Sequence, residues 1–211
     1  MTNPDALRIL KDAKAILDQD HFVLTSGRHS DTYVNCKARN IPTKDLSRLC
    51  AMLAAAHLSH KIDVVVGPAE GGVLIAEFTS NHLMNMAART SVPSVTAQKD
   101  GHGGFVFTRD DDKSIVGRRI LVVEDVLTSG GSVKKVVTLV SDCGGQIVSV
   151  GALVNRGEVN AIDVGSPHLY SLVELFIPSW TEEECQASQM CHRGVPINTT
   201  IGHGAKYLAS R

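Results

Sequence analysis

The chain has 211 residues, a one-domain length, and 43% of them are hydrophobic and 20% charged, as in an ordinary globular protein. Its 21 basic and 22 acidic residues leave a net charge of −1, which argues against a broad nucleic-acid surface. The longest uncharged run, residues 143–155, is too short to span a membrane, and charges near the N-terminus argue against a signal peptide. We therefore expect a cytoplasmic protein that binds neither membranes nor nucleic acids.

The spacing of apolar residues predicts an alternation of helices and strands. From the N-terminus, the pattern predicts a helix at 5–19, a helix at 44–60, a strand at 62–66, a helix at 71–89, and short strands at 94–97 and 105–108. Next come a strand at 120–123, a helix at 132–140, and strands at 147–154 and 169–177. This order favours an α/β fold, with a parallel sheet flanked by helices.

The most informative segment follows the strand at 120–123 and leads into the next helix. It reads Glu124, Asp125, Val126, Leu127, Thr128, Ser129, Gly130, Gly131, Ser132. Small residues let successive N–H groups and the helix N-terminus converge on a phosphate, and the hydroxyls add donors. The two acids would repel phosphate but suit the vicinal hydroxyls of a ribose near a magnesium ion. The segment therefore predicts a ribose 5-phosphate site, the simpler alternative being a capped helix with exposed acids.

Residues 122–132 resemble the phosphoribosyl pyrophosphate (PRPP) signature of the type I phosphoribosyltransferases. The resemblance implies that Glu124 and Asp125 hold the ribose hydroxyls and that residues 126–132 bind the 5-phosphate. It also implies that Mg²⁺ is bound through PRPP, with the two acids reaching it through water and no direct protein ligand.

The same resemblance implies one phosphoribosyltransferase domain over residues 1–211. Its core is expected at 41–162, and the chain ends, 1–40 and 163–211, are expected to build a small hood.

A second strand end carries Ala69, Glu70, Gly71 and Gly72. Glycines there allow the bare backbone to approach a ligand closely, although a plain strand-to-helix turn explains the residues equally well. Family members place a similar loop against the pyrophosphate, which implies that role here. Some orotate enzymes have a lysine where this chain has Gly71.

A third segment, residues 98–104, places glycines around His102 just after Lys99. Such a loop can present cations, and a lysine closing over the leaving pyrophosphate would stabilise its charge. His102 is a candidate for proton transfer, and the alternative for the whole segment is a solvated hairpin tip. By resemblance, the loop at 98–108 is shared across the subunits of a homodimer, although Gln98 stands where an arginine is common.

The accepting base is indicated by residues 21–33, which resemble the start of the orotate phosphoribosyltransferases. Backbone amides at Ser26 and Gly27, with the charge of Arg28, suit an orotate carboxylate. By the same resemblance, Arg156 and Thr128 meet the base. Many members carry a lysine where this chain has Thr25.

Two cysteines near the C-terminus, Cys185 and Cys191, resemble a pair that lies closer together in some orotate enzymes. Their spacing is not that of a zinc pair, and further ligands are not evident from the sequence. We therefore expect no metal in this tail and reduced thiols throughout.

The leading hypothesis is a glycosyltransferase of pyrimidine biosynthesis. It transfers ribose 5-phosphate from PRPP to orotate, with Lys99, Asp125 and His102 as catalytic candidates, and releases orotidine 5-phosphate and pyrophosphate. The alternatives are a phosphoribosyltransferase for a purine base and a non-catalytic regulator that senses PRPP. A dinucleotide-binding oxidoreductase is disfavoured because no G-x-G-x-x-G follows a strand.

Overall fold

The structure is a computed structural model that describes residues 2–24 and 26–210, without the side chains of residues 109 and 110. The chain forms two compact units. The core unit comprises Met1–Ile9 and Cys36–Leu175, and the terminal unit comprises Leu10–Asn35 and Phe176–Arg211. Each unit is considered by itself below.

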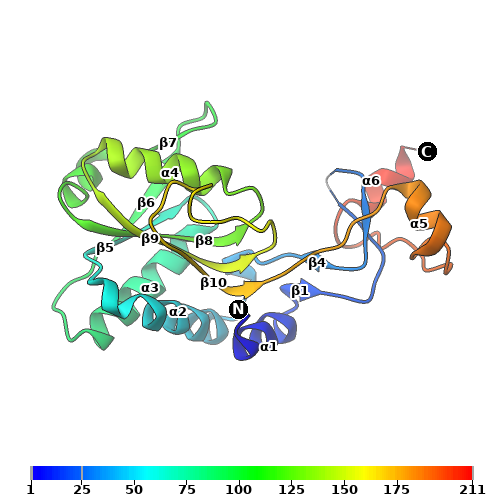
Figure 1. Cartoon of the computed structure of the whole chain (residues 1–211), viewed down its shortest axis with the longest axis horizontal. Coiled ribbons are helices and arrows are strands. Elements are labelled where there is room, and N and C mark those ends of the chain that lie inside the picture. Colours follow the sequence, from blue (N-terminus) through cyan, green and yellow to red (C-terminus); the bar gives the residue numbers. More distant parts are fainter. Residues whose placement is uncertain (1, 25, 211) are drawn as a thin grey trace. The chain divides into compact units, whose positions relative to one another are not determined.

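The core unit is built on a six-stranded sheet with the order β10-β9-β8-β5-β6-β7 (Figure 1). All neighbouring strands are parallel except β6 and β7, which form an antiparallel hairpin. The strands are β5 (Val64–Pro68), β6 (Ser94–Lys99), β7 (Phe105–Val106), β8 (Arg119–Leu127), β9 (Gln146–Asn155) and β10 (Leu169–Glu174). The predicted α/β fold with a parallel sheet is confirmed.

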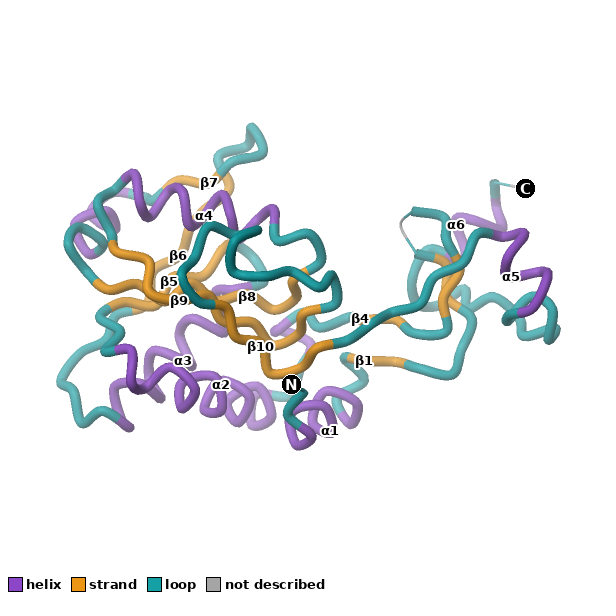
Figure 2. Tube along the Cα trace, viewed as in Figure 1, coloured by secondary structure: helices purple, strands orange, loops and turns teal. Residues whose placement is uncertain are grey.

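Helices cover both faces of this sheet (Figure 2). The helices α2 (Thr43–His57) and α3 (Gly72–Met86) pack on one face, and α4 (Gly131–Asp142) packs on the other. Three short 3-10 helices complete the unit: η1 (Ala38–Asn40), η2 (Leu58–His60) and η3 (Arg109–Ser114). The face under α4 buries valines of β5, β8 and α4 at almost zero exposure, which is the continuous apolar run expected of parallel strands covered on both sides.

The prediction of a helix over 5–19 is wrong in its second half. The helix α1 spans only Pro4–Asp12. Lys14 adopts a left-handed backbone conformation with φ of 55°, and the Ala15 N–H donates to the Leu10 carbonyl over 2.8 Å. This is the hydrogen-bond pattern of a helix C-cap, formed here without the glycine that normally signals it.

The terminal unit contains only short elements. Its strands have two residues each and pair as two antiparallel ladders, β1 with β4 and β2 with β3. The elements are β1 (Ile16–Leu17), β2 (Phe22–Val23), β3 (His29–Ser30), β4 (Tyr33–Val34), α5 (Glu182–Ser188) and α6 (Gly204–Ala209). Hydrophobic periodicity cannot detect elements of this length, and the sequence predicted none of them.

Two predicted strand ends also move. The strand β8 continues to Leu127, so both acids of the phosphate segment belong to it, because its ladder with β9 persists as far as the pair Leu127–Asn155. The strand β10 stops at Glu174 rather than 177.

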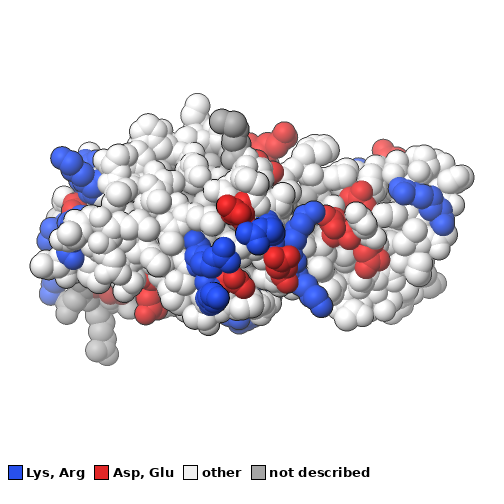
Figure 3. Space-filling view, turned by 90° about the horizontal axis from the view of Figure 1, so that it is seen from below, with Lys and Arg blue, Asp and Glu red and all other residues white. Residues whose placement is uncertain are grey.

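None of the helices in the described part of the chain combines the length and apolar composition that crossing a bilayer requires. On the face drawn in Figure 3, basic side chains lie interspersed with acidic ones, and neither sign forms a continuous surface there. This distribution agrees with the low net charge and gives a nucleic acid no extended basic surface on this face.

A buried histidine on α2 predicts a pH dependence of stability. His57 Nδ1 lies 2.8 Å from the Leu53 carbonyl and Nε2 lies 3.0 Å from Ser149 Oγ, and burial lowers the pKa of His57 from 6.5 to about 4. Between these values the unfolded chain binds a proton that the folded chain does not. Stability is therefore lost as the pH falls from 6.5 toward 4, by up to about 3 kcal/mol.

Urea unfolding of the wild type and of His57→Gln across this pH range measures the effect. We expect the variant to lose distinctly less stability than the wild type, while the exposed His102→Gln control behaves as wild type. Equal pH slopes in the wild type and His57→Gln would contradict the assignment.

Candidate active site

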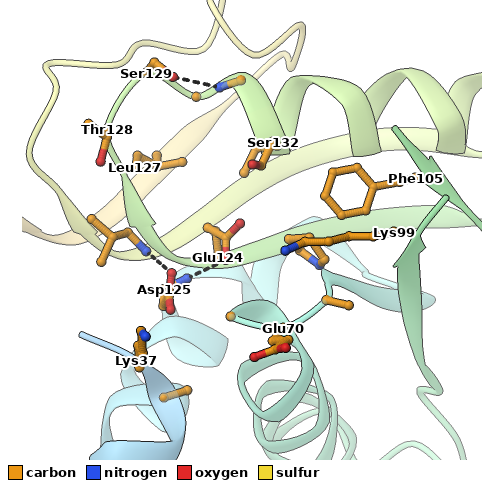
Figure 4. Close-up of a pocket in the computed structure, with 18 of the residues that line it drawn as sticks. Lys37, Glu70, Lys99, Phe105, Glu124, Asp125, Leu127, Thr128, Ser129 and Ser132 are labelled. Atoms are coloured by element: carbon orange, nitrogen blue, oxygen red, sulfur yellow. Dashed lines mark hydrogen bonds between the residues drawn. The ribbon is translucent and has the colours of Figure 1, made fainter. Parts of the chain in front are cut away.

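A cavity of about 370 Å³ opens at the carboxyl ends of β5, β6 and β8 in the core unit (Figure 4). In an open parallel sheet this edge is where ligands bind. The lining includes most of the predicted PRPP-binding residues: Ala69, Glu70, Gly71, Glu124, Asp125, Val126, Leu127, Thr128, Ser129, Gly130, Gly131 and Ser132. Two segments that are more than 50 residues apart in the sequence, 69–71 and 124–132, thus meet at one site.

Two acids form the floor of the cavity at the end of β8. Glu124 is only 8% exposed. The Asp125 N–H donates to Glu124 Oε1 over 3.1 Å, and the Val126 N–H donates to Asp125 Oδ1 over 2.7 Å. Each carboxylate therefore has one oxygen held by a backbone N–H at the cavity floor. Such a pair suits sugar hydroxyls or a hard divalent cation.

Burial of two acids side by side makes their ionisation costly. Burial raises the pKa of Glu124 well above its ordinary value, and the charge of Asp125 raises it further. The pKa of Asp125 is also raised, again chiefly by burial. Carboxyl groups with shifted pKa values in a cavity indicate a functional site, because their burial does not stabilise the fold.

Two lysines face the acids from opposite sides (Figure 4). Lys99, at the end of β6, extends toward Glu124, and its positive charge partly offsets the rise in the pKa of that acid. The charge of Lys37 partly offsets the rise in the pKa of Asp125 in the same way. Lys37 precedes η1 and Arg39 lies within it, and neither was predicted because this segment has no recognisable sequence pattern. Arg39 Nη1 lies 3.3 Å from Glu70 Oε2 at the rim.

The predicted phosphate loop connects β8 to α4. Gly130 has φ of 71°, and an added Cβ would lie 2.8 Å from Val164 Cγ1, so a side chain is excluded on both grounds. The turn places Gly131 at the start of α4, where its N–H lies 3.4 Å from Ser129 Oγ. The other N–H groups of this first turn can donate hydrogen bonds to a phosphate.

Arg156 lies at this loop as well. Its Nε donates to Thr128 Oγ1 over 2.9 Å, although it does not line the cavity itself. The next residue, Gly157, packs so closely on the Thr128 carbonyl that a Cβ would overlap it. The end of β9 therefore supports the phosphate loop, a contact that residue spacing could not predict.

The glycines of the 69–72 turn allow close packing on the acids. An added Cβ on Gly71 would lie 2.7 Å from both Glu124 Oε1 and Asp125 Oδ2, and one on Gly72 would lie 2.7 Å from the Val123 carbonyl. Gly72 begins α3 and does not line the cavity. The Ala69–Glu70 peptide bond in the same turn is cis. A lysine at position 71, as some orotate enzymes have, would require the acids to move.

The structure does not bring His102 to the cavity. The segment 100–104 is a hairpin tip between β6 and β7, in which Asp100 Oδ1 accepts the N–H groups of His102 and Gly104 over 2.7 and 2.8 Å. His102 is exposed at this tip, whereas Lys99 lines the cavity.

The expected base-binding residues Ser26, Gly27 and Arg28 belong to the terminal unit. The Arg28 guanidinium donates to Ser179 Oγ over 3.0 Å, to the Ser179 carbonyl over 2.7 Å, and to Glu184 over 3.3 Å. These contacts restrain its side chain within that unit. Thr25 lies outside the described residues.

Paired acids, a glycine-rich loop opening a helix, and a facing lysine at a parallel sheet edge define a site for a phosphorylated sugar. The comparisons agree with this class, because the phosphoribosyl transferase domain matches residues 42–163. The chain belongs to the phosphoribosyltransferase family, as the sequence predicted.

Within this family the similar proteins include orotate phosphoribosyltransferases. That of Caldanaerobacter subterraneus is 36% identical over 86% of this chain and 88% of its own length. That of Chlorobium phaeobacteroides is 35% identical, over 94% of this chain and 95% of its own. The crystal structure of the Mycobacterium tuberculosis orotate phosphoribosyltransferase is similar in fold, with a TM-score of 0.62 and 23% identity over 82% of this chain and 97% of that one.

Proposed function

We propose that the protein transfers ribose 5-phosphate from PRPP to orotate, giving orotidine 5-phosphate and pyrophosphate. A bond forms between the base nitrogen and the anomeric carbon, while the bond from that carbon to pyrophosphate breaks and its electron pair leaves with the pyrophosphate. The observation that carries the proposal is the buried Glu124 and half-buried Asp125, which face Lys99 beside a glycine-rich loop. Similarity to orotate enzymes over most of the chain supports the choice of base.

The chain's own residues position the sugar. The N–H groups at the start of α4, with the hydroxyls of Thr128, Ser129 and Ser132, bind the 5-phosphate. Glu124 and Asp125 accept hydrogen bonds from the ribose hydroxyls and orient the anomeric carbon. Positioning alone contributes strongly to the rate of such displacements, so we expect the two acids at the cavity floor to contribute much of the rate acceleration.

Positively charged groups stabilise the negative charge on the departing pyrophosphate. Lys99 stabilises the negative charge that develops there, and the 69–72 turn approaches the same group with its bare backbone. Glu124 and Asp125 are the residues that would hold a magnesium ion bound with PRPP, and that ion would supply further charge neutralisation. Carboxylate oxygens such as these fit a water-mediated contact to the ion.

The base is bound by a separate set of residues. We assign the orotate ring to Thr128 and Arg156, whose side chains contact each other at the phosphate loop. In a homodimer the tip of the 98–108 loop serves the partner subunit's site, where His102 transfers a proton, whereas Lys99 at the base of the loop serves the cavity of its own subunit.

The test is pyrophosphate release by purified protein with PRPP, Mg²⁺ and one base at a time: orotate, uracil, xanthine, hypoxanthine or adenine. We expect release with orotate alone. Release with a purine instead would support the proposed transfer reaction and contradict the assignment of orotate as the accepting base. PRPP binding without release on any base would replace the enzyme with a PRPP-sensing regulator.

A further inference from the structure

Four potential metal ligands converge inside the terminal unit. His21 precedes β2, His29 begins β3, Cys185 lies in α5, and Cys191 follows that helix. One ligand atom from each, two imidazole nitrogens and two sulfurs, lies within 4.8 Å of every other. Both histidines and Cys185 are at most 1% exposed. Among the described residues, this is the one group of three or more histidines, cysteines or acids close enough to hold a metal ion.

The distances approach those of a tetrahedral zinc site. Zinc bonded at about 2.3 Å to sulfur and about 2.0 Å to nitrogen separates nitrogen from sulfur by about 3.5 Å. Here His21 Nε2 lies 3.8 Å from Cys185 Sγ and 3.7 Å from Cys191 Sγ, and His29 Nδ1 lies 3.4 Å from Cys191 Sγ. The two nitrogens are 2.7 Å apart and must separate by about 0.6 Å to bind the ion.

Surrounding groups already orient the ligands. His21 Nδ1 lies 2.8 Å from the Val195 carbonyl, to which it donates, and this selects the tautomer whose Nε2 has a lone pair facing the cluster. The Cys191 N–H points at Cys185 Sγ over 3.2 Å, the kind of donor that supports a thiolate ligand. The backbones of His29 and Trp180 exchange two hydrogen bonds of 2.8 Å, which tie β3 to the start of the α5 segment.

The terminal unit also has little else to hold it together. Its strands have two residues each, and α5 and α6 have seven and six residues. Its described hydrophobic residues that are buried are Leu10, Ala15, Ile16, Phe22, Val23, Cys185 and Met190. Units with such a small core are commonly stabilised by a structural metal.

We propose that His21, His29, Cys185 and Cys191 bind one structural zinc ion that holds the two halves of the terminal unit together. Two imidazoles and two thiolates are the ligands zinc prefers, and because the protein supplies all four, the ion has no open position for substrate. The proposal reverses the sequence expectation of no metal in the tail. That expectation considered only the C-terminal cysteines, whereas the other two ligands come from the N-terminal segment.

The test uses the full chain without a polyhistidine tag, dialysed against Zn²⁺ and then washed. We expect one zinc per chain by elemental mass spectrometry, and loss of that zinc in Cys185→Ser and Cys191→Ser. Two matched controls, Cys143→Ser in the core unit and His192→Gln beside Cys191, should retain it. Wild type without stoichiometric zinc would overturn the proposal, as would serine variants that keep it.

Because a serine variant that fails to fold would also lose the metal, Co²⁺ substitution provides a second readout. The wild type should show the visible absorption of tetrahedral Co²⁺ and a near-ultraviolet charge-transfer band from two thiolates. His29 binds through Nδ1, the ring nitrogen nearer to its backbone, and a cysteine sulfur extends almost as far from the backbone as that nitrogen. The variant His29→Cys can therefore still place a ligand atom at the ion. This variant should keep the tetrahedral spectrum and gain charge-transfer intensity; an octahedral spectrum in the wild type would contradict the site.

Discussion

Glu124→Gln and Asp125→Asn are expected to lose activity by about 10²-fold or more while the ligand-free proteins become more stable than the wild type. Activity falls because an amide cannot accept the ribose hydroxyls as a carboxylate does, and the anomeric carbon is then misplaced. Stability rises because burial raises the pKa of both acids, and the charge of Asp125 raises the pKa of Glu124 further. Above these raised pKa values each charge costs folding free energy, which the neutral isostere removes, by about 0.5–2 kcal/mol.

The pH dependence makes this prediction specific. As the pH falls toward 4.5, the ordinary value for a glutamate, the folded wild type takes up protons at Glu124 and the cost disappears. The stability advantage of Glu124→Gln should therefore shrink as the solution is acidified. Urea unfolding without ligand measures stability, and pyrophosphate release measures activity. Glu77→Gln, on the exposed face of α3, should change neither; a destabilised Glu124→Gln would show that the acid is structural.

Lys99→Gln is expected to lower kcat by about 10²–10³-fold with a much smaller change in the KM for PRPP. Lys99 extends into the cavity from β6 and faces Glu124 (Figure 4). Pyrophosphate gains charge as the bond to the anomeric carbon breaks, so the ammonium group interacts more strongly with the transition state than with bound PRPP. An interaction of that kind appears in kcat rather than in KM.

Steady-state kinetics with varied PRPP separates the two parameters. Lys44→Gln, an exposed lysine at the start of α2, is the matched control for removal of one positive charge and should match the wild type. If Lys99→Gln raised KM alone, the lysine would serve ground-state binding of the pyrophosphate and not the chemical step.

The core of the site could be predicted because it is local in the chain. Residues 124–132 run from the end of β8 through the loop into α4, so a strand, two acids and a glycine turn specify their own geometry over a few residues. The alternation of buried strands with amphipathic helices likewise indicated a parallel sheet, whose carboxyl edge is where ligands bind.

Other features depend on contacts between distant segments. Lys37 reaches Asp125 from a segment with no pattern of its own, and Arg156 reaches Thr128 only because β9 lies beside β8. The early end of α1 is decided by a left-handed Lys14, a conformation for which a lysine gives no local signal.

The ligand cluster of the terminal unit is the clearest case. His21 and Cys185 are 164 positions apart, and the spacing of Cys185 and Cys191 alone does not match a zinc pair. Local spacing along the chain determined the strand–loop–helix unit that recognises the phosphorylated sugar, because neighbouring residues build it. Tertiary folding determined which cations face the acids and which histidines meet the cysteines, because those partners approach only when remote segments pair.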